Sequence, residues 1–179
     1  TAEAVQALSL SRGAKAYFIQ HDERVFNERQ EHRAERDAVE KSWHLPMHRI
    51  VVAKWIADEM NRSGVTDDIA VVPNAVDHSL FHAPKRGKQA RPTIGMLFAP
   101  VRFKGCDIGF AAFELAKKAI PQLRMLCLSE PDPPPGIPEG VEFVCRPNQE
   151  QIREVYAACD AWLFCSRSEG FGLPILEAM

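Results

Sequence analysis

The sequence predicts an α/β fold built from doubly wound parallel sheets, and three observations support this prediction. Short apolar runs alternate with helical or charged runs along most of the 179 residues, which is the order of elements in parallel sheets. Apolar runs end in polar or glycine-rich turns, where open parallel sheets bind ligands. Hydrophobic residues are 46% and charged residues 26% of the chain, as in ordinary globular proteins.

Each expected element follows from its local pattern. The first strand, 15–22, is apolar and ends in a polar turn. The stretch 27–41 is charged on nearly every face, so it is either an exposed helix or a mobile segment. Pro174 suits a first helical position, because its fixed φ is already helical and its missing N–H is not needed there. The other expected strands are 49–53, 69–72, 93–98, 123–128, 141–145 and 161–165, and the other expected helices are 54–62, 107–120 and 149–159.

Two segments lack a regular pattern. Residues 130–140 are too rich in proline for a helix or a strand. Residues 85–91 are basic and polar, and they form the best domain boundary by composition. We interpret this basic run as a solvated linker, in preference to a binding surface.

The overall composition excludes several classes of protein. A net charge of −2 leaves no electrostatic footprint for nucleic acid, and no apolar run approaches the ~18 residues of a membrane span. The five cysteines are spread singly and their number is odd, so reduced thiols are expected. Neither cysteine nor histidine occurs in pairs at ligand spacing, which argues against a structural zinc site.

The most informative segment is SEGFGLPILEAM, residues 168–179. It places Glu169 and Glu177 eight positions apart, with a Gly-Phe-Gly turn between them and an apolar run before them. The order is therefore strand, glycine turn and helix start, where exposed N–H groups attract anions. Glu177 would repel a phosphate there, and it is better placed to accept hydrogen bonds from sugar hydroxyls, as acidic residues hold ribose in dinucleotide folds.

This segment resembles the signature of retaining, nucleotide-sugar-dependent glycosyltransferases of family four, the glycosyl transferases group 1, which have the GT-B fold. The family pattern is about E-G-F-G-L-P-x-x-E-A-M, and every fixed position is filled here. The resemblance implies that Glu169 contacts donor-sugar hydroxyls and steadies positive charge at the anomeric carbon, while Glu177 holds the ribose hydroxyls. Backbone N–H groups would face the sugar and diphosphate at Gly170, Phe171, Gly172 and Leu173.

Two further segments agree with the resemblance. Residues 71–81, VVPNAVDHSLF, are similar to the inter-domain segment of the family, with Ala75 in place of a glycine; the backbone there should therefore not need a positive φ. The expected strand 93–98 leads to Arg102, Lys104 and Gly105. The family has a basic residue and then Lys-Gly in this loop, and the cations bind the donor diphosphate. The arginine of the family usually lies farther from the lysine than Arg102 does.

His21 is a second catalytic candidate beside Glu169. It ends the first expected strand, and several relatives have a histidine near the donor sugar at such a strand end. The alternative is an ordinary turn histidine. Tyr17-Phe-Ile-Gln20 with its acidic turn resembles, more narrowly, bacterial rhamnosyltransferases of surface polysaccharide synthesis.

The resemblance implies two Rossmann-like domains, both incomplete in this chain. Residues 1–84 would be the rear part of an N-terminal, acceptor-side domain, 85–91 a linker, and 92–179 the front part of the C-terminal, nucleotide-sugar-binding domain. The chain opens on Thr1 and stops at Met179 inside an expected helix. We therefore expect a fragment of a longer enzyme, inactive by itself.

The function implied is transfer of a sugar, a hexose or rhamnose, from a nucleotide-diphosphate sugar to a hydroxyl with retention, in cell-surface polysaccharide synthesis. The acceptor would be a carbohydrate or a lipid-linked glycan. No cofactor and no metal are expected, because cations and N–H groups would neutralise the leaving diphosphate. We expect no nucleic-acid partner, no transmembrane segment and a cytoplasmic location, with peripheral contact at the inner face of the membrane in the full protein.

Three other functions remain open from the sequence. A glycoside hydrolase also needs two carboxylates, but it would give the loop at Lys104 no purpose. A sugar-nucleotide epimerase of the same fold would differ only in its products. A non-catalytic nucleotide-binding module is the third alternative.

Overall fold

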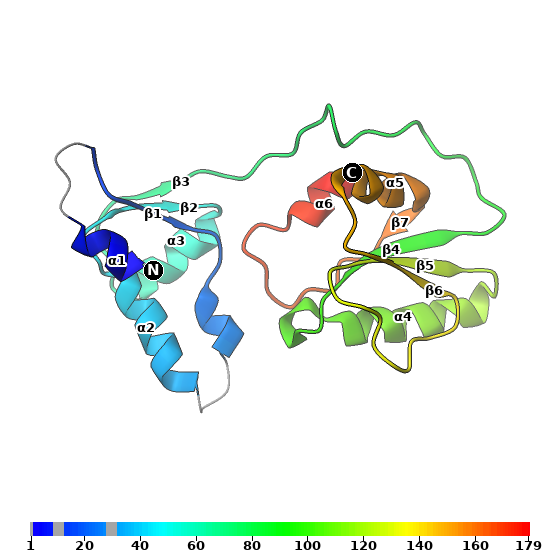
Figure 1. Ribbon diagram of the computed structural model, residues 1–179, viewed down its shortest axis with the longest axis horizontal. Coiled ribbons are helices and arrows are strands. Elements are labelled where there is room, and N and C mark those ends of the chain that lie inside the picture. The colour runs from blue at the N-terminus through cyan, green and yellow to red at the C-terminus, as the bar shows by residue number, and fades with distance from the viewer. Residues whose placement is uncertain (1, 9–12, 28–31) are drawn as a thin grey trace. The chain divides into compact units, whose positions relative to one another are not determined.

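The computed structural model describes residues 2–8, 13–27 and 32–179. The chain forms two compact units of contacts, each drawn in Figure 1. The first unit comprises Thr1–Asn74 together with Ser168–Phe171, and the second comprises Ala75–Arg167 together with Gly172–Met179. The domain bounds expected from composition, 1–84, 85–91 and 92–179, stay a prediction.

The first unit contains a three-stranded parallel sheet in the order β1-β2-β3. Ala16 of β1 lies opposite His48 of β2, and Arg49 of β2 lies opposite Ile69 of β3. The core includes Ile19, Val51, Ile56, Met60 and Trp43, so α2 and α3 both pack on the sheet. The elements are α1 (Ala2–Ala7), β1 (Ala16–Ile19), a 3-10 helix (Glu23–Asn27), α2 (Arg33–Trp43), β2 (His48–Val51), α3 (Lys54–Arg62) and β3 (Ile69–Val71).

The second unit contains a four-stranded parallel sheet in the order β6-β5-β4-β7. Its elements are β4 (Thr93–Phe98), a 3-10 helix (Arg102–Lys104), α4 (Cys106–Ala119), β5 (Arg124–Ser129), β6 (Val141–Cys145), α5 (Gln149–Ala158), β7 (Ala161–Trp162) and α6 (Leu173–Ala178).

Strand β5 shows why this sheet is covered on both faces. Its side chains alternate between two cores, because successive residues of a strand point to opposite faces. Met125 and Cys127 pack with Phe113 of α4, whereas Leu126 and Leu128 pack with Val155 of α5. Helices α4 and α5 therefore lie on opposite faces of the sheet, as Figure 1 shows. The second unit is doubly wound, and the α/β fold class expected from the sequence is confirmed.

Most expected elements are present, and one strand is much shorter than expected. The bounds of α3, β4 and β6 are as expected. The expected strand 161–165 is wrong beyond Trp162, because only Leu163 makes one more bond to β4, from its N–H to the carbonyl of Gly95. The chain then turns away, and the N–H of Arg167 donates to the carbonyl of Phe103.

The charged stretch 27–41 gives an exposed helix that is anchored at its end. Helix α2 begins at Arg33 and extends past the expected stretch, where Ser42 and Trp43 are buried. Part of this stretch, 28–31, lies outside the described residues. The aromatic anchor explains the helix, because burial of one large side chain adds stability that a uniformly charged surface lacks.

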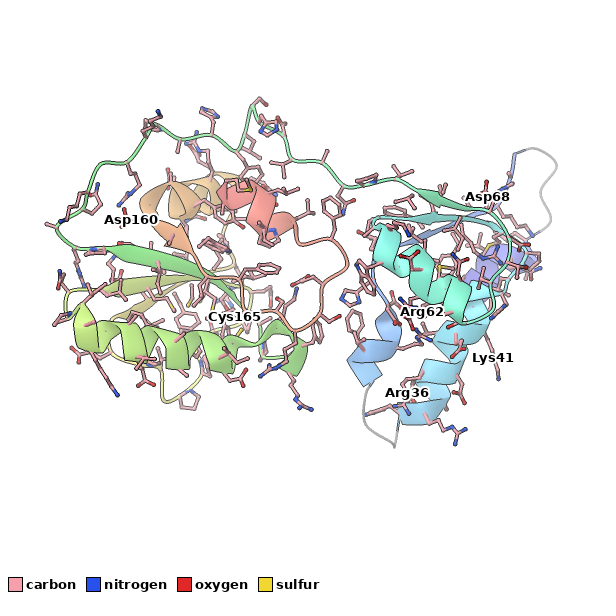
Figure 2. The ribbon with its side chains drawn as sticks, turned by 180° about the vertical axis from the view of Figure 1, so that it is seen from behind. Arg36, Lys41, Arg62, Asp68, Asp160 and Cys165 are labelled. Atoms are coloured by element: carbon pink, nitrogen blue, oxygen red, sulfur yellow. The ribbon has the colours of Figure 1, made fainter. Side chains whose placement is uncertain are left out.

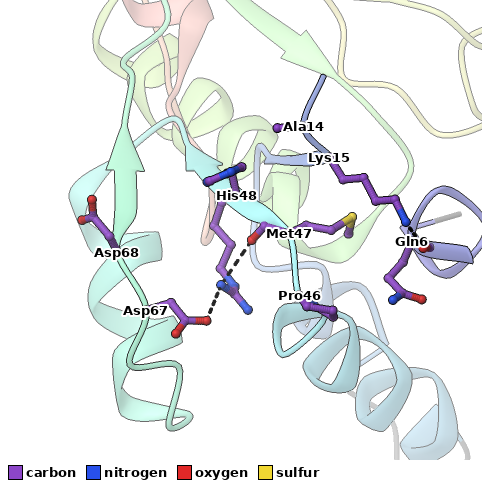
Figure 3. Close-up of a pocket in the computed structure, with 9 residues that line it drawn as sticks. Gln6, Ala14, Lys15, Pro46, Met47, His48, Asp67 and Asp68 are labelled. Carbon is purple, nitrogen blue, oxygen red and sulfur yellow. Dashed lines mark hydrogen bonds and ion pairs between the residues drawn. The ribbon is translucent and has the colours of Figure 1, made fainter. Parts of the chain in front are cut away.

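Arg49 is a charged residue inside the first unit, only 4% exposed. Its guanidinium donates to the carbonyls of Trp43, Leu45 and Met47 and, at 2.9 Å, to the carboxylate of Asp67. Met47 and Asp67, two of these acceptors, are labelled in Figure 3. Burial of a charge is tolerated only with such full pairing, so Arg49 fixes the loop between α2 and β2.

The segment after β3 is partly ordered by its own side chains. Asp77 accepts hydrogen bonds from the N–H and the hydroxyl of Ser79, and these bonds hold the pKa of Asp77 below its usual value. Arg146 is the one non-glycine residue with a positive φ in the described part of the chain. Ala75 therefore has a negative φ, which confirms the expectation from its replacement of a glycine.

Asp160 connects the long segment before β4 to the second sheet. It accepts a hydrogen bond from the N–H of Thr93 at 2.8 Å and one from Arg86 at 3.1 Å. Figure 2 shows Asp160 beside this segment. The hydrogen bond from Thr93 is the main cause that lowers the pKa of Asp160. The hydrogen bond from Arg86 thus attaches the basic run 85–91 to Asp160, which directly precedes β7, although most residues of the run are exposed.

Candidate functional site

The segment Ser168–Phe171 packs against the carboxyl end of β1. Gly170 is buried, and a Cβ placed on it would overlap the carbonyl oxygen of Gln20 and lie 3.4 Å from the Cα of His21. Phe171 packs against the core of the first unit. A glycine is required here, because any side chain at position 170 would force the two backbone segments apart.

His21 lies in an aromatic setting at this strand end. Its ring centroid is 4.9 Å from that of Phe26 and 5.9 Å from that of Trp55, the latter in an edge-on arrangement. Its Nδ1 is 3.0 Å from the carbonyl oxygen of Asp22. Because a carbonyl only accepts, Nδ1 is the donor in this hydrogen bond.

The turn that follows His21 is held by a buried ion pair. Asp22 is 6% exposed and accepts two hydrogen bonds of 2.9 Å from the Arg24 guanidinium. Arg24 also donates to Glu59 at 2.7 Å and stacks over the ring of Trp43. A bidentate arginine–carboxylate pair of this kind fixes geometry as well as charge, so the position of His21 relative to β1 is well defined.

In the second unit, the loop with Arg102 and Lys104 follows the carboxyl end of β4. It forms a 3-10 turn, and Gly105 then takes a φ of +64° and leads directly into α4. A Cβ on Gly105 would overlap the carbonyl oxygen of Cys165. Lys104 therefore stands beside the N-terminus of a 14-residue helix, whose exposed N–H groups and dipole favour an anion.

Arg167 fixes this loop from the other side, and sequence reasoning missed it. Its N–H donates to the carbonyl of Phe103 at 2.7 Å, and its guanidinium donates to the carbonyl of Arg102 and to both carboxylate oxygens of Asp107. These bonds lower the pKa of Asp107. The available signal was the position of Arg167, two residues before Glu169 in the signature.

Glu177 belongs to the short helix α6 and is bound to α5. It accepts a hydrogen bond of 2.8 Å from the hydroxyl of Tyr156. Helix α6 begins at Leu173, after Gly172 with a φ of +85°. Pro174 is therefore the second helical residue and not the first, a shift of one position from the expectation.

Each unit has a pocket among its described residues. One, of about 630 Å³, is lined by Glu177, Tyr156 and Phe81 and by the basic side chains of Arg86 and Arg153. The other, of about 670 Å³, lies in the first unit (Figure 3) and is lined by Lys15, His48 and Asp68, which stand at or just before the first residues of the three strands. It is thus at the opposite sheet edge from His21.

The predicted site residues fall into three groups. His21, Glu169, Gly170 and Phe171 belong to the first unit, Arg102 and Lys104 share one loop of the second unit, and Gly172, Leu173 and Glu177 belong to the start and end of α6. Lys104 does not line the pocket beside Glu177. Their roles stay predictions.

The bond between Tyr156 and Glu177 gives a pH-dependent prediction. Burial, and then the hydrogen bond to Glu177, raise the pKa of Tyr156 above its usual value of 10.0. Because folding raises the pKa of Tyr156, the protonated side chain contributes to the stability of the folded protein. This contribution is fully present below 10.0, the pKa of the unfolded chain, and is lost as the pH rises through the pKa of the folded protein. Glu177→Gln removes the negative charge, so the pKa of Tyr156 should fall towards 10.0. Absorbance of the phenolate, measured as a difference from a Tyr156→Phe variant, checks this; an unchanged titration would mean that Tyr156 and Glu177 are not in contact.

Residues 135–179 match the family described as glycosyl transferases group 1. This stretch includes α5, β7, α6 and the signature with both glutamates. No curated protein sequence matches the chain.

Several solved structures share the fold. A sucrose-phosphate synthase from Thermosynechococcus elongatus has 18% identity and a TM-score of 0.71, with 91% of this chain and 47% of that chain covered. S. aureus TarM in complex with fondaparinux, alpha-GlcNAc-glycerol and UDP has 16% identity and a TM-score of 0.72, with 94% and 35% covered. The pneumococcal O-GlcNAc transferase GtfA in complex with UDP and GlcNAc has 16% identity and a TM-score of 0.61, with 99% and 37% covered.

At such low sequence identities, the structural similarity shows the fold and not the activity. The fold is the GT-B type expected from the sequence, with parallel α/β units. The chain spans between about a third and a half of the length of these structures. In the parts of the chain that the structure describes, no helix has the length and apolar character needed to cross a bilayer.

Proposed function

We propose that this protein is part of a glycosyltransferase that moves a sugar from a nucleoside-diphosphate sugar to a hydroxyl group with retention of configuration. The observation that carries the proposal is the complete signature Glu169–Met179 on a fold shared with UDP-bound glycosyltransferases. The match of residues 135–179 to the glycosyl transferases group 1 supports it. The proposed setting is cell-surface polysaccharide synthesis at the cytoplasmic side of the membrane, with a carbohydrate or lipid-linked glycan as acceptor.

The proposed chemistry is mainly electrostatic. Glycosyl transfer passes through a state with positive charge at the anomeric carbon and negative charge on the leaving phosphate. Glu169 would face the positive charge, with His21 beside the donor sugar. Lys104 and Arg102 would hold the diphosphate at the N-terminus of α4, so that neither metal nor cofactor is needed. Glu177 would accept hydrogen bonds from the ribose hydroxyls.

The test of this proposal is nucleotide binding by the longer protein with both domains complete, measured by saturation-transfer NMR with UDP, GDP and dTDP, each in the presence of a metal chelator. Binding of one diphosphate in preference to the other two is expected, and it would name the donor base. Preference for dTDP would favour a rhamnosyl donor. Failure to bind any of the three would contradict the proposal.

Lys104→Ala provides the matched variant for this test. It should weaken the diphosphate roughly 10-fold and the corresponding nucleoside hardly at all, because a charge-assisted bond to phosphate is lost. Lys118→Ala is the control, since Lys118 is an exposed lysine in the last turn of α4, the helix that follows the Lys104 loop. Equal effects of the two variants would place the diphosphate away from the Lys104 loop.

A further inference from the structure

The indole of Trp55 holds the signature segment at its centre. The indole N–H donates a hydrogen bond of 2.8 Å to the carbonyl oxygen of Gly170. These residues are 115 positions apart in the chain. The bond satisfies a carbonyl of the residue that directly follows Glu169, so it acts on the backbone that carries this carboxylate.

The helix that carries Trp55 is anchored in the core of the first unit. Trp55 is the second residue of α3, and the next two residues of this helix, Ile56 and Ala57, are buried in the core of the first unit with Met60. The residue is 37% exposed, and its ring stands edge-on to the imidazole of His21. One side chain therefore contacts both the histidine at the end of β1 and the backbone beside Glu169.

Two other contacts make the position of the segment specific. Gly170 lies so close to the Gln20–His21 backbone that a Cβ is excluded, and Phe171 packs on the core. Close packing prevents movement towards β1, but it does not prevent the peptide from rotating or sliding along the strand end. A directional hydrogen bond to the Gly170 carbonyl restricts that remaining freedom.

We infer that Trp55 is a positioning residue that sets the place of the Glu169 carboxylate relative to His21 by binding the Gly170 carbonyl. The inference rests on the proposed function for the role of Glu169, but the contact itself can be tested without any substrate. A displacement of about 1 Å in a reacting group can cost roughly 100-fold in rate. Loss of one of several restraints should cost less, roughly 10-fold.

The first measurement is hydrogen exchange of the indole N–H groups by NMR. The chain has three tryptophans, so each indole signal is assigned by a Trp→Phe variant. Gly170→Ala should displace the carbonyl acceptor, move the Trp55 signal and speed its exchange about 5-fold or more. If Gly170→Ala does not fold, the reverse variant serves: Trp55→Phe should shift the carbonyl carbon signal of Gly170. An unchanged signal in the variant that folds would overturn the inference.

The second measurement is kinetic, is made on the full-length enzyme, and uses Trp162→Phe as a control. The indole nitrogen of Trp162 is buried and has no hydrogen-bond partner in the described part of the chain, so Trp162→Phe removes an indole N–H without removing a hydrogen bond. Trp55→Phe should lower kcat roughly 10-fold with the KM for the donor unchanged within about twofold, whereas Trp162→Phe should leave kcat unchanged within about twofold.

A double-mutant comparison separates positioning from general destabilisation. In a Glu169→Gln background, Trp55→Phe should have no further effect on kcat, because the carboxylate it positions is gone. An undiminished 10-fold loss there, or a kcat for Trp55→Phe equal to wild type, would overturn the inference. Failure of the wild type to use any nucleoside-diphosphate sugar would contradict the proposed function alone, since indole exchange still tests the Trp55–Gly170 contact.

Discussion

Replacement of Glu169 by glutamine is expected to lower the rate of sugar transfer roughly 100-fold or more, with nucleoside-diphosphate binding changed by no more than about threefold. Glutamine keeps the shape and the hydrogen-bonding oxygen but removes the negative charge. In the proposed mechanism that charge acts only when positive charge develops at the anomeric carbon, so the loss should fall on kcat and not on affinity. Single-turnover kinetics of the full-length enzyme, with the donor identified by nucleotide binding, would measure it.

The controls for this prediction use the other carboxylates of the chain. Glu3→Gln removes an exposed carboxylate of α1 in the same unit and should leave the rate unchanged. If Glu177 binds the ribose as proposed, Glu177→Gln should mainly weaken nucleotide binding, because the ribose hydroxyls lie away from the reacting carbon. Near-native rates in Glu169→Gln, Glu177→Gln and Lys104→Ala together would exclude the assignment of this site.

Gly105→Ala is expected to destabilise the second unit by about 3 kcal/mol, a fall of roughly 15 °C in its melting temperature. Two costs add. Alanine is strained at a φ of +64°, and its Cβ would overlap the carbonyl oxygen of Cys165 and lie 2.9 Å from its carbonyl carbon. Relief of the overlap would move the Lys104 loop away from Arg167, so diphosphate binding should weaken as well. Calorimetry and nucleotide titration measure the two effects.

Two other glycines of the same unit separate these costs. Gly136 has a φ of +78° but open space around it, so Gly136→Ala should show the conformational cost alone, about 1 kcal/mol. Gly87 has neither a positive φ nor a close neighbour, so Gly87→Ala should be neutral or stabilise by up to about 0.5 kcal/mol. Equal melting temperatures for Gly105→Ala and Gly136→Ala would show that Cys165 is not in contact with Gly105.

The sequence predicted the elements well where a local pattern defines them. Strand β4 and helix α3 have the expected bounds, because an apolar run or a helical face is written in adjacent residues. Strand β7 was overestimated, since an apolar run does not show where its neighbouring strand stops pairing. Arg49 was expected in a strand, and it lies in β2. Its burial was not expected, because it depends on carbonyl groups at the end of α2 and in the loop after it, which no periodicity reveals.

The residues of the candidate site could be proposed from the sequence, but their arrangement in space could not. The signature and the Lys-Gly step are contiguous, so both glutamates and Lys104 could be proposed from the sequence. Trp55 could not, because its hydrogen-bond partner, the carbonyl of Gly170, is a backbone atom 115 positions away in the chain. Backbone acceptors leave no mark in residue type, and contacts of this kind appear only in the folded structure.

Ser168–Phe171 belongs to the first unit, and this affects the design of chimeras between this protein and others of the same fold. A chimera that exchanges whole halves at the basic segment 85–91 would transfer these four residues with the second half. They would then meet a foreign partner in place of Gln20 and Trp55, although the junction itself is far away. A chimera should keep the position of Glu169 if Ser168–Phe171 stays with its own first half. The same result is expected if the residues equivalent to Gln20 and Trp55 are transferred together with Ser168–Phe171.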